Sequence, residues 1–358
     1  MASPGDRIKK LLDLMQEEGF TGILIRSPAN IFYFTGYMGP GLLLVSVDGP
    51  PILYVYPLDY ELAQNTCIDQ VQISQLGMES SLKDVIESIP DSVKVKLGFD
   101  FMSAEDYLRL SEYLGNSLTP ASKQVWRLRM IKDSDELEKI RKASEISSRC
   151  MELARDLIED GVMESEVKAE VMKEMLKLGA EKAAFDIIVA SGPRSSLPHG
   201  GLGDRMMKSG DVVVVDLGAV YQGYCSDMTR TFYIGSDPDD KIKEVYEVVS
   251  RAKKAAEEAA AIGVKVSELY EKSYEEIASK GYGEYYIHSL GHGVGIEIHE
   301  PPRVFRGVDE ILSEGLVITI EPGVYLPGKF GVRIEDTILI RRDRIETLTS
   351  APYDLELG

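Results

Sequence analysis

The chain has 358 residues, 44% of them hydrophobic, which is more than one core usually organises, so two domains are expected. The formal net charge of −19 disfavours nucleic acid and anionic membranes as partners, because both would repel it. Three widely spaced cysteines, Cys67, Cys150 and Cys225, and the lack of any apolar run of about 18 residues predict a cytoplasmic protein without disulfides or membrane spans.

The first 122 residues alternate helical and strand patterns, which predicts a small α/β domain. Helices are expected at 7–18, 81–89 and 104–114, strands at 22–25 and 95–99, and a hairpin at 42–47 and 52–56. The aromatic stretch 30–37 is interpreted as core packing. Residues 117–124 are polar and contain Thr119-Pro120, and this segment is the predicted boundary between domains 1–122 and 123–358.

The second domain opens with a capping box, Asp133 with Glu136, that begins a long helix towards Ile158. A further helix is expected at 164–178, and strand patterns begin at Phe185.

Two apolar runs, 212–220 and 223–234, flank a turn and predict a hairpin that Asp216 and Asp227 interrupt. A carboxylate in an apolar strand costs several kcal/mol unless it is paired or binds a cation. We expect both side chains on one face of the hairpin.

A second predicted hairpin, 316–320 with 332–340, brings Glu321 near Glu335. Four carboxylates in one apolar core would repel each other strongly unless cations lie between them. The alternative is a network of salt bridges with Arg230, Arg303 and Arg333.

Residues 287–300 contain three of the four histidines in the chain, His288, His292 and His299. His292 and the four carboxylates make five ligands, which is too many for one tetrahedral zinc and suits two ions that share carboxylates. Oxygen-rich ligation favours Mn or Co, with Fe and Zn as alternatives. Two such ions lower the pKa of a bridging water, so hydroxide attack on a carbonyl or phosphoryl centre is expected.

His199 lies on a predicted turn at 196–200, and it could donate a proton to the developing oxyanion or the leaving nitrogen. His299 could hold the substrate carbonyl, and His288 is interpreted as structural. Packing without a catalytic role is the alternative for each.

Six ordered motifs then identify a family resemblance: FDIIVASGPRSSLPHG (185–200), VVVDLG (213–218), SDMTRT (226–231), HSLGHGVGIEIHE (288–300), IEPGVY (320–325) and GVRIED (331–336). Together they resemble the metallopeptidases of the pita-bread fold, above all prolidase and aminopeptidase P, over roughly residues 125 to 350. The stretch 30–37 is similar to the N-terminal domain that these two groups share with creatinase and that methionine aminopeptidases lack.

The resemblance implies an α/β N-terminal domain followed by an α+β pita-bread catalytic domain, and a dinuclear peptidase that cuts the bond before proline. By the same resemblance, the metal ligands are Asp216, Asp227, His292, Glu321 and Glu335. Glu321 would also handle the proton of the bridging water, His199 and His299 would line the substrate site, and Phe185 would form a wall for the proline ring.

The modest length resembles prolidases of simple prokaryotes, which are commonly dimers, so a homodimer acting on Xaa-Pro dipeptides is predicted. We hypothesise that Arg303 pairs with the free carboxylate of the dipeptide, and a surface or structural arginine is the alternative. The alternatives are an aminopeptidase P acting on longer proline-containing peptides, and a peptide-binding protein without catalysis.

Overall fold

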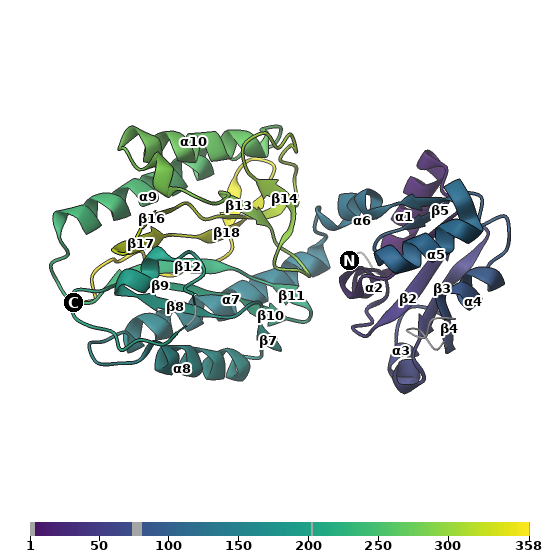
Figure 1. Cartoon of the computed structure of the whole chain (residues 1–358), viewed down its shortest axis with the longest axis horizontal. Coiled ribbons are helices and arrows are strands. Elements are labelled where there is room, and N and C mark those ends of the chain that lie inside the picture. Colours follow the sequence, from purple (N-terminus) through teal and green to yellow (C-terminus); the bar gives the residue numbers. More distant parts are fainter. Residues whose placement is uncertain (1–3, 74–80, 202, 358) are drawn as a thin grey trace. The chain divides into compact units, whose positions relative to one another are not determined.

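A computed structural model describes residues 4–73, 81–201 and 203–357. The chain forms two compact units, Met1–Arg129 and Met130–Gly358, which we call the N-terminal and C-terminal units. Figure 1 colours the first purple to blue and the second teal to yellow. Among the described residues, no helix combines the length and the apolar character needed to cross a bilayer.

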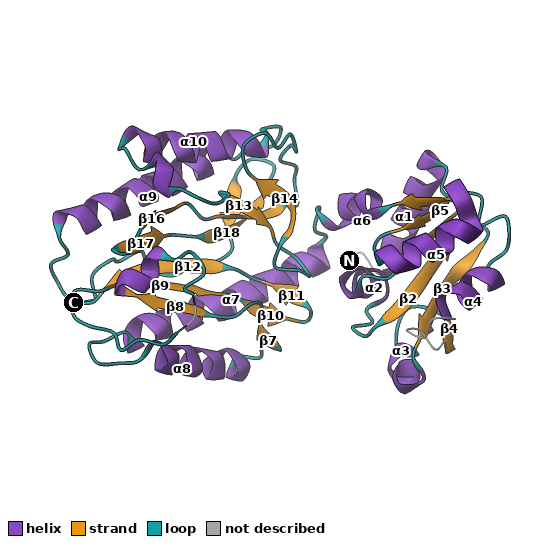
Figure 2. Ribbon diagram, viewed as in Figure 1, coloured by secondary structure: helices purple, strands orange, loops and turns teal. Residues whose placement is uncertain are grey.

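The described part of the N-terminal unit, residues 4–73 and 81–129, is built on a mixed six-stranded sheet (Figure 2). In spatial order its strands are β4 (Gln70–Ile73), β3 (Gly49–Val55), β2 (Gly41–Ser46), β1 (Gly22–Ile25), β5 (Leu97–Phe99) and β6 (Leu118–Pro120). Its helices are α1 (Pro4–Glu18), α2 (Pro28–Thr35), α3 (Tyr60–Ala63), α4 (Ser81–Ser88), α5 (Ala104–Leu114) and α6 (Ser122–Arg129). The predicted helices, strands and hairpin of this unit are therefore confirmed, apart from their ends.

The start of one strand differs clearly from the prediction. The strand predicted at 95–99 begins only at Leu97, because the preceding residues form turns and Val95 is exposed. The aromatic stretch 30–37 lies mostly in α2, where Ile31, Tyr33 and Phe34 are buried, so its interpretation as core is confirmed.

The boundary between the two units lies after Arg129, whereas the sequence predicted it after residue 122. The polar segment 117–124 does not separate them, because β6 pairs with β5 and α6 packs on α1. Within α6, Gln124 donates to the Glu18 carboxylate at 2.5 Å, and Arg129 donates to Asn30 Oδ1 at 2.6 Å. These contacts hold α6 in the N-terminal unit.

The C-terminal unit has sheets between two pairs of helices (Figure 1). The pairs are α7 (Ser134–Leu157) with α8 (Glu164–Lys177), and α9 (Asp240–Ala259) with α10 (Val266–Ser279). The capping box of Asp133 and Glu136 is present at the start of α7, as predicted. Each helix pair covers an apolar cluster, with Val171 and Val215 in one and Val249 and Ile318 in the other.

Within residues 130–201 and 203–357, the strands of this unit form four sheets. They are β12 (Met228–Tyr233), β9 (Val212–Leu217) and β8 (Ile188–Ser191); β11 (Tyr224–Cys225), β10 (Ala219–Tyr221) and β7 (Lys182–Ala183); β14 (Glu300–Val304), β13 (Gly291–Gly293), β15 (Val317–Ile320), β18 (Asp336–Ile340) and β19 (Ile345–Thr347); and β16 (Gly323–Leu326) with β17 (Phe330–Arg333).

Both predicted acidic hairpins are present, but each arm passes from one sheet into another. The first changes sheets at Gly218 on the way out and at Ser226-Asp227 on the return. The second changes at Glu321-Pro322 and at Ile334-Glu335. Three of the four acidic residues, Asp227, Glu321 and Glu335, therefore stand between two named strands, where the chain passes from one sheet to the next.

Candidate metal centre and active site

The first hairpin places Asp216 and Asp227 on one face. Strand β9 pairs with β12 so that Asp216 lies opposite Thr229. Asp227 precedes Thr229 by two residues, and alternate residues of an extended segment point to the same side. At the tip, Gln222 and Gly223 have φ values of 46° and 79°, the positive pair typical of a two-residue hairpin turn.

The second hairpin brings Glu321 close to Glu335. Strands β15 and β18 end their pairing with Ile320 opposite Asp336, and the two glutamates are the next residues beyond this pair. The backbone N–H of Glu335 also donates to the carbonyl of Thr229 at 3.1 Å. This bond joins the two acidic hairpins, so their carboxylates face a common space.

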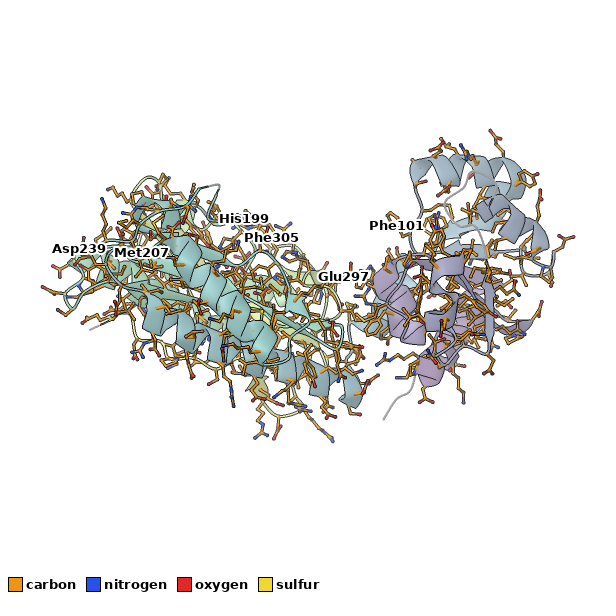
Figure 3. The ribbon with its side chains drawn as sticks, turned by 90° about the horizontal axis from the view of Figure 1, so that it is seen from below. Phe101, His199, Met207, Asp239, Glu297 and Phe305 are labelled. Atoms are coloured by element: carbon orange, nitrogen blue, oxygen red, sulfur yellow. The ribbon has the colours of Figure 1, made fainter. Side chains whose placement is uncertain are left out.

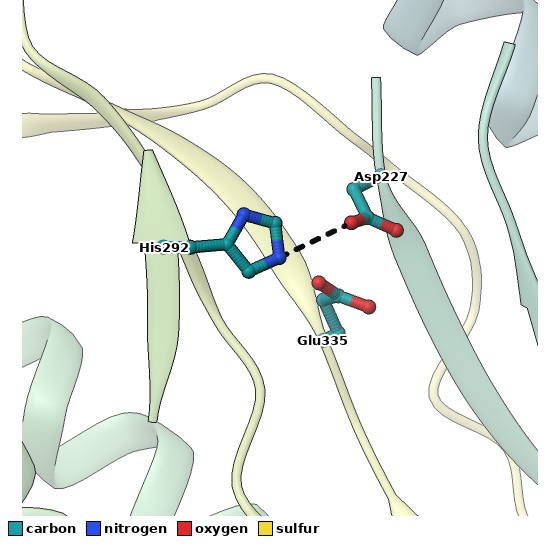
Figure 4. A group of neighbouring side chains, drawn as sticks. All are labelled: Asp227, His292 and Glu335. Carbon is teal, nitrogen blue, oxygen red and sulfur yellow. Dashed lines mark ion pairs between the residues drawn. The ribbon is translucent and has the colours of Figure 1, made fainter. Parts of the chain in front are cut away.

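His292 enters this space from β13, which lies between β14 and β15. Its Nδ1 lies 3.0 Å from the carbonyl oxygen of Gly293, which turns Nε2 towards the carboxylates. Nε2 is 3.4 Å from Glu321 Oε1 and 3.6 Å from Asp227 Oδ2. Ligand atoms of Asp227, His292 and Glu335 all lie within 4.8 Å of one another (Figure 4).

The electrostatics of this cluster fit a divalent cation. Burial, followed by repulsion from neighbouring carboxylates, raises the pKa values of Asp227 and Glu335 well above their usual range. Burial, with Asp216 nearby, raises the pKa of Glu321 to about 8. Burial lowers the pKa of His292 to about 4, so its imidazole is neutral near pH 7.

Buried carboxylate oxygens without a hydrogen-bond partner also indicate a cation site. Asp216 Oδ1, Asp227 Oδ1 and Glu335 Oε1 are buried, and none has a hydrogen-bond partner among the described residues. A buried carboxylate oxygen needs a donor or a cation. Several such oxygens beside a neutral imidazole form a donor set suited to transition metals.

The salt-bridge alternative holds for one carboxylate only. Arg333 pairs with Asp216 at 2.5 Å, whereas Arg230 pairs with Asp336, and Arg303 lies over the Phe305 ring at 4.7 Å. In the described part of the chain, Asp227, Glu321 and Glu335 make no ion pair with lysine or arginine.

A cavity of about 780 Å³ in the C-terminal unit collects every site residue named from the sequence. It is lined by Phe185, His199, Asp216, Asp227, His292, His299, Arg303, Glu321 and Glu335. The rings of His292 and His299 have their centroids 4.4 Å apart, and partial burial lowers the pKa of His299. Figure 3 labels His199 and Phe305, which lie along one edge of this unit in that view.

Two known protein families match this chain, each over a different part of it. "Metallopeptidase family M24" matches residues 138–342, and the family described as "Creatinase/Prolidase N-terminal domain" matches residues 7–131. The chain belongs to metallopeptidase family M24. The resemblance inferred from the motifs is thereby confirmed, as is the predicted fold of a creatinase-type N-terminal domain before a pita-bread catalytic domain.

Similar M24 proteins match this chain over nearly its whole length. It is 40% identical to the Xaa-Pro dipeptidase of Pyrococcus furiosus, covering 98% of this chain and 99% of that protein. The structure of the prolidase from Pyrococcus horikoshii OT3 is 39% identical, with a TM-score of 0.90 and coverages of 98% and 99%. An X-Pro aminopeptidase from Thermotoga maritima is 37% identical, with a TM-score of 0.88 and the same coverages.

The M24 site also contains polar supports that sequence reasoning did not single out. Thr229 Oγ1 donates to Glu335 Oε2 at 2.7 Å. Thr319 Oγ1 donates to Glu321 Oε1 at 3.2 Å and accepts a bond from the His292 N–H at 3.1 Å. The signals in the sequence were weak: each threonine stands two residues from an acidic residue of its own segment, Thr229 after Asp227 and Thr319 before Glu321.

His288, which the sequence suggested was structural, also lines the cavity. Its Nε2 lies 3.1 Å from the hydroxyl of Tyr325, which accepts a bond from Arg333 at 2.7 Å. Arg333 thus connects His288, through Tyr325, with Asp216.

Proposed function

We propose that this protein is a metal-dependent Xaa-Pro dipeptidase that hydrolyses the peptide bond preceding proline. The observation that carries the proposal is the convergence of Asp227, His292 and Glu335, with Asp216 and Glu321, in one cavity. The 40% identity to a Xaa-Pro dipeptidase supports the choice of substrate.

In this proposal, two divalent ions are held by Asp216, Asp227, His292, Glu321 and Glu335. Mn and Co are our first choices because oxygen ligands outnumber nitrogen, with Fe and Zn as alternatives. When bound, such ions supply a water whose pKa is lowered towards neutrality.

The chain's own groups bind the peptide and carry protons. Glu321 is proposed as the proton acceptor, because its Oε1 lies 3.4 Å from Nε2 of the candidate ligand His292 and so beside the water that bound ions would supply. His199 and His299 are exposed to the cavity, where they contact the peptide and stabilise charge on the reacting carbonyl. Phe185 forms the wall for the proline ring.

Arg303 is proposed to pair with the free carboxylate of the dipeptide. Its guanidinium lines the cavity and stacks over Phe305, which limits the positions it can adopt. A guanidinium so held suits bidentate binding of a carboxylate.

One observation favours the second candidate, an aminopeptidase P that acts on longer peptides. A hollow of about 580 Å³ shares Asp186, Ile188 and His199 with the main cavity. Additional residues of a peptide would find space there. The 37% identity to an X-Pro aminopeptidase agrees with this candidate.

The deciding experiment is hydrolysis of Ala-Pro and Ala-Pro-Ala by chelator-stripped protein, before and after addition of Mn or Co. Metal-restored cleavage of Ala-Pro, with little cleavage of Ala-Pro-Ala, is the expected result. Preference for Ala-Pro-Ala would identify the aminopeptidase. Binding of either peptide without turnover under any metal would identify a non-catalytic binding protein.

We also propose a cytoplasmic homodimer. All three cysteines are free, which suits a reducing compartment. Large apolar side chains of the N-terminal unit are exposed, including Leu58 and Leu62, and these could be covered in a dimer. Light scattering on the purified protein measures the mass directly, and a monomeric mass would overturn the dimer.

A further inference from the structure

His299 stands on a less regular part of the chain than the candidate ligands. His292 is within β13, and the acidic residues lie in strands or at their junctions, but residues 294–299 form bends between β13 and β14. The backbone bonds of this segment involve its first residues: the Val294 N–H donates to the Val317 carbonyl, the Cys225 N–H donates to the Gly295 carbonyl, and the Gly295 N–H donates to the Glu297 carbonyl. The position of the His299 ring therefore depends on other contacts.

The carboxylate of Glu300, the next residue after His299, supplies such a contact. Its side chain is 1% exposed, and its Oε1 accepts a bond from the Glu297 N–H at 3.1 Å. The segment closes tightly over this group, since a Cβ on Gly295 would lie 2.6 Å from both carboxylate oxygens. Residues 295–300 thus fold around one buried negative charge.

The cation for this charge comes from a distant part of the chain. Lys132 Nζ lies 3.1 Å from Glu300 Oε2, and the Lys132 side chain is also 1% exposed. Lys132 is itself fixed, because its N–H donates to the Gly315 carbonyl at 2.9 Å and Ile131 bridges to Leu316. Loss of one partner from a buried ion pair leaves the other charge uncompensated in the interior.

We propose that Lys132, through its ion pair with Glu300, is a positioning residue that fixes residues 294–299 and so sets the place of His299 in the substrate site. This inference rests on the proposed peptidase function. Loss of the ammonium group removes a buried ion pair from the Glu300 carboxylate, which favours opening of this segment towards water, and His299 would move with it. The four candidate carboxylate ligands lie outside this segment, and only the His292 ring contacts it, through His299, so the protein should keep its ions.

The test is a double-mutant cycle on the metal-loaded protein with Ala-Pro and Ala-Pro-Ala as substrates. The variants are Lys132→Met, His299→Ala, the double variant, and Lys132→Arg, which keeps the charge. Lys265→Met is the matched control, because Lys265 forms a long-range ion pair of 2.7 Å with Asp309 that is exposed. Metal content, the thermal midpoint, and hydrogen exchange of residues 294–299 are measured for each variant.

We expect Lys132→Met to lower kcat/KM by at least about tenfold with unchanged metal content, and Lys132→Arg to recover most of the loss. Exchange at 294–299 should rise while exchange in β15 does not. In the His299→Ala background, Lys132→Met should change kcat/KM by less than about twofold, since its effect passes through His299.

Independent effects that multiply in the double variant would overturn the inference, and so would unchanged exchange at 294–299. If Lys132→Met does not fold, Glu300→Gln removes the charge while keeping the shape, and the same cycle applies to it. A wild-type protein that cleaves neither peptide would refute the proposed function instead, and the exchange measurement would still decide the role of Lys132.

Discussion

Arg333 donates a hydrogen bond to Asp216, with 2.5 Å between Nη2 and Oδ2, inside a cavity that four candidate ligand carboxylates share. Within the described chain, it is the one lysine or arginine that pairs with any of these four carboxylates. The guanidinium is buried and also donates to Tyr325 and to the carbonyl of Pro198. It therefore offsets part of the negative charge even before a metal binds.

Replacement of Arg333 should affect the metal-free protein most. Arg333→Met removes one partner of a buried pair, which typically costs about 3–5 kcal/mol. Bound ions would supply positive charge in its place, so the loss should be smaller in the metal-loaded protein. The measurement is the thermal midpoint with chelator and with Mn, and Arg341→Met, whose partner Glu346 is partly exposed, is the control. An equal drop in both states would mean that Arg333 acts only through packing.

Replacement of the candidate ligand Asp227 by a neutral residue should stabilise the metal-free protein and destabilise the metal-loaded protein, each relative to the wild type. Asp227→Asn removes a carboxyl group whose ionised form is disfavoured by burial and by its neighbours, so the chelated variant should melt above the chelated wild type. With metal, the wild type should melt higher, because the variant binds less of it. Calorimetry and metal analysis check both parts, with the exposed Glu170→Gln as control. A chelated variant that melts below the wild type would contradict the repulsion argument.

The metal-free protein should lose stability as the pH rises from about 6.5 to 8. In this range folded Glu321, with a pKa of about 8, keeps a proton that the unfolded chain, with a pKa of 4.5, has released. Asp227 and Glu335 act in the same direction. His288 and His292, whose pKa values fall from 6.5 to about 4, have the opposite effect, but only below about pH 6.5.

Denaturant unfolding at several pH values tests this slope in chelated and metal-loaded protein. The metal-loaded protein should show a smaller decline, because the carboxylates are then held ionised. A chelated protein that becomes more stable between pH 6.5 and 8 would show that these carboxylates are ionised without cost.

Replacement of Arg303 should distinguish substrates by the position of their carboxylate. Arg303→Met is expected to lower kcat/KM for Ala-Pro by about 10- to 100-fold, the usual loss for a hydrogen bond to a charged group, and to affect Ala-Pro-Ala less. Arg306→Met is a close control, because Arg306 lies over Tyr270 at 5.1 Å and over Phe305 at 5.8 Å but does not line the cavity. Equal losses of kcat/KM for both substrates would show that Arg303 does not bind the free carboxylate of the dipeptide.

The sequence predicted the acidic hairpins because a carboxylate among β-branched residues is conspicuous and because strand periodicity determines which residues share a face. It did not show that Glu321 and Glu335 stand where strands change sheets, since Glu321-Pro322-Gly323 could equally have been a break within one strand. Strand propensity alone cannot predict where a chain passes from one sheet to another, because this depends on how the two sheets pack together.

Polar contacts between residues far apart in the chain could not be predicted from the sequence either. Nothing near Lys132 marks it as the partner of Glu300, which is 168 residues away. The position of the unit boundary was missed for a similar reason, because α6 reads as a polar segment and only its contacts with α1 and Asn30 assign it to the N-terminal unit.

The place of Lys132 in the chain limits how the two units could be separated. It is the third residue of the C-terminal unit and precedes α7, the first regular helix of that unit. A fragment that began at Ser134 would contain every candidate ligand and the whole cavity lining, yet Glu300 would have lost its buried ion pair with Lys132. Any dissection, fusion or circular permutation of this peptidase therefore has to treat residues 130–133 as part of the catalytic half and not as a disposable linker.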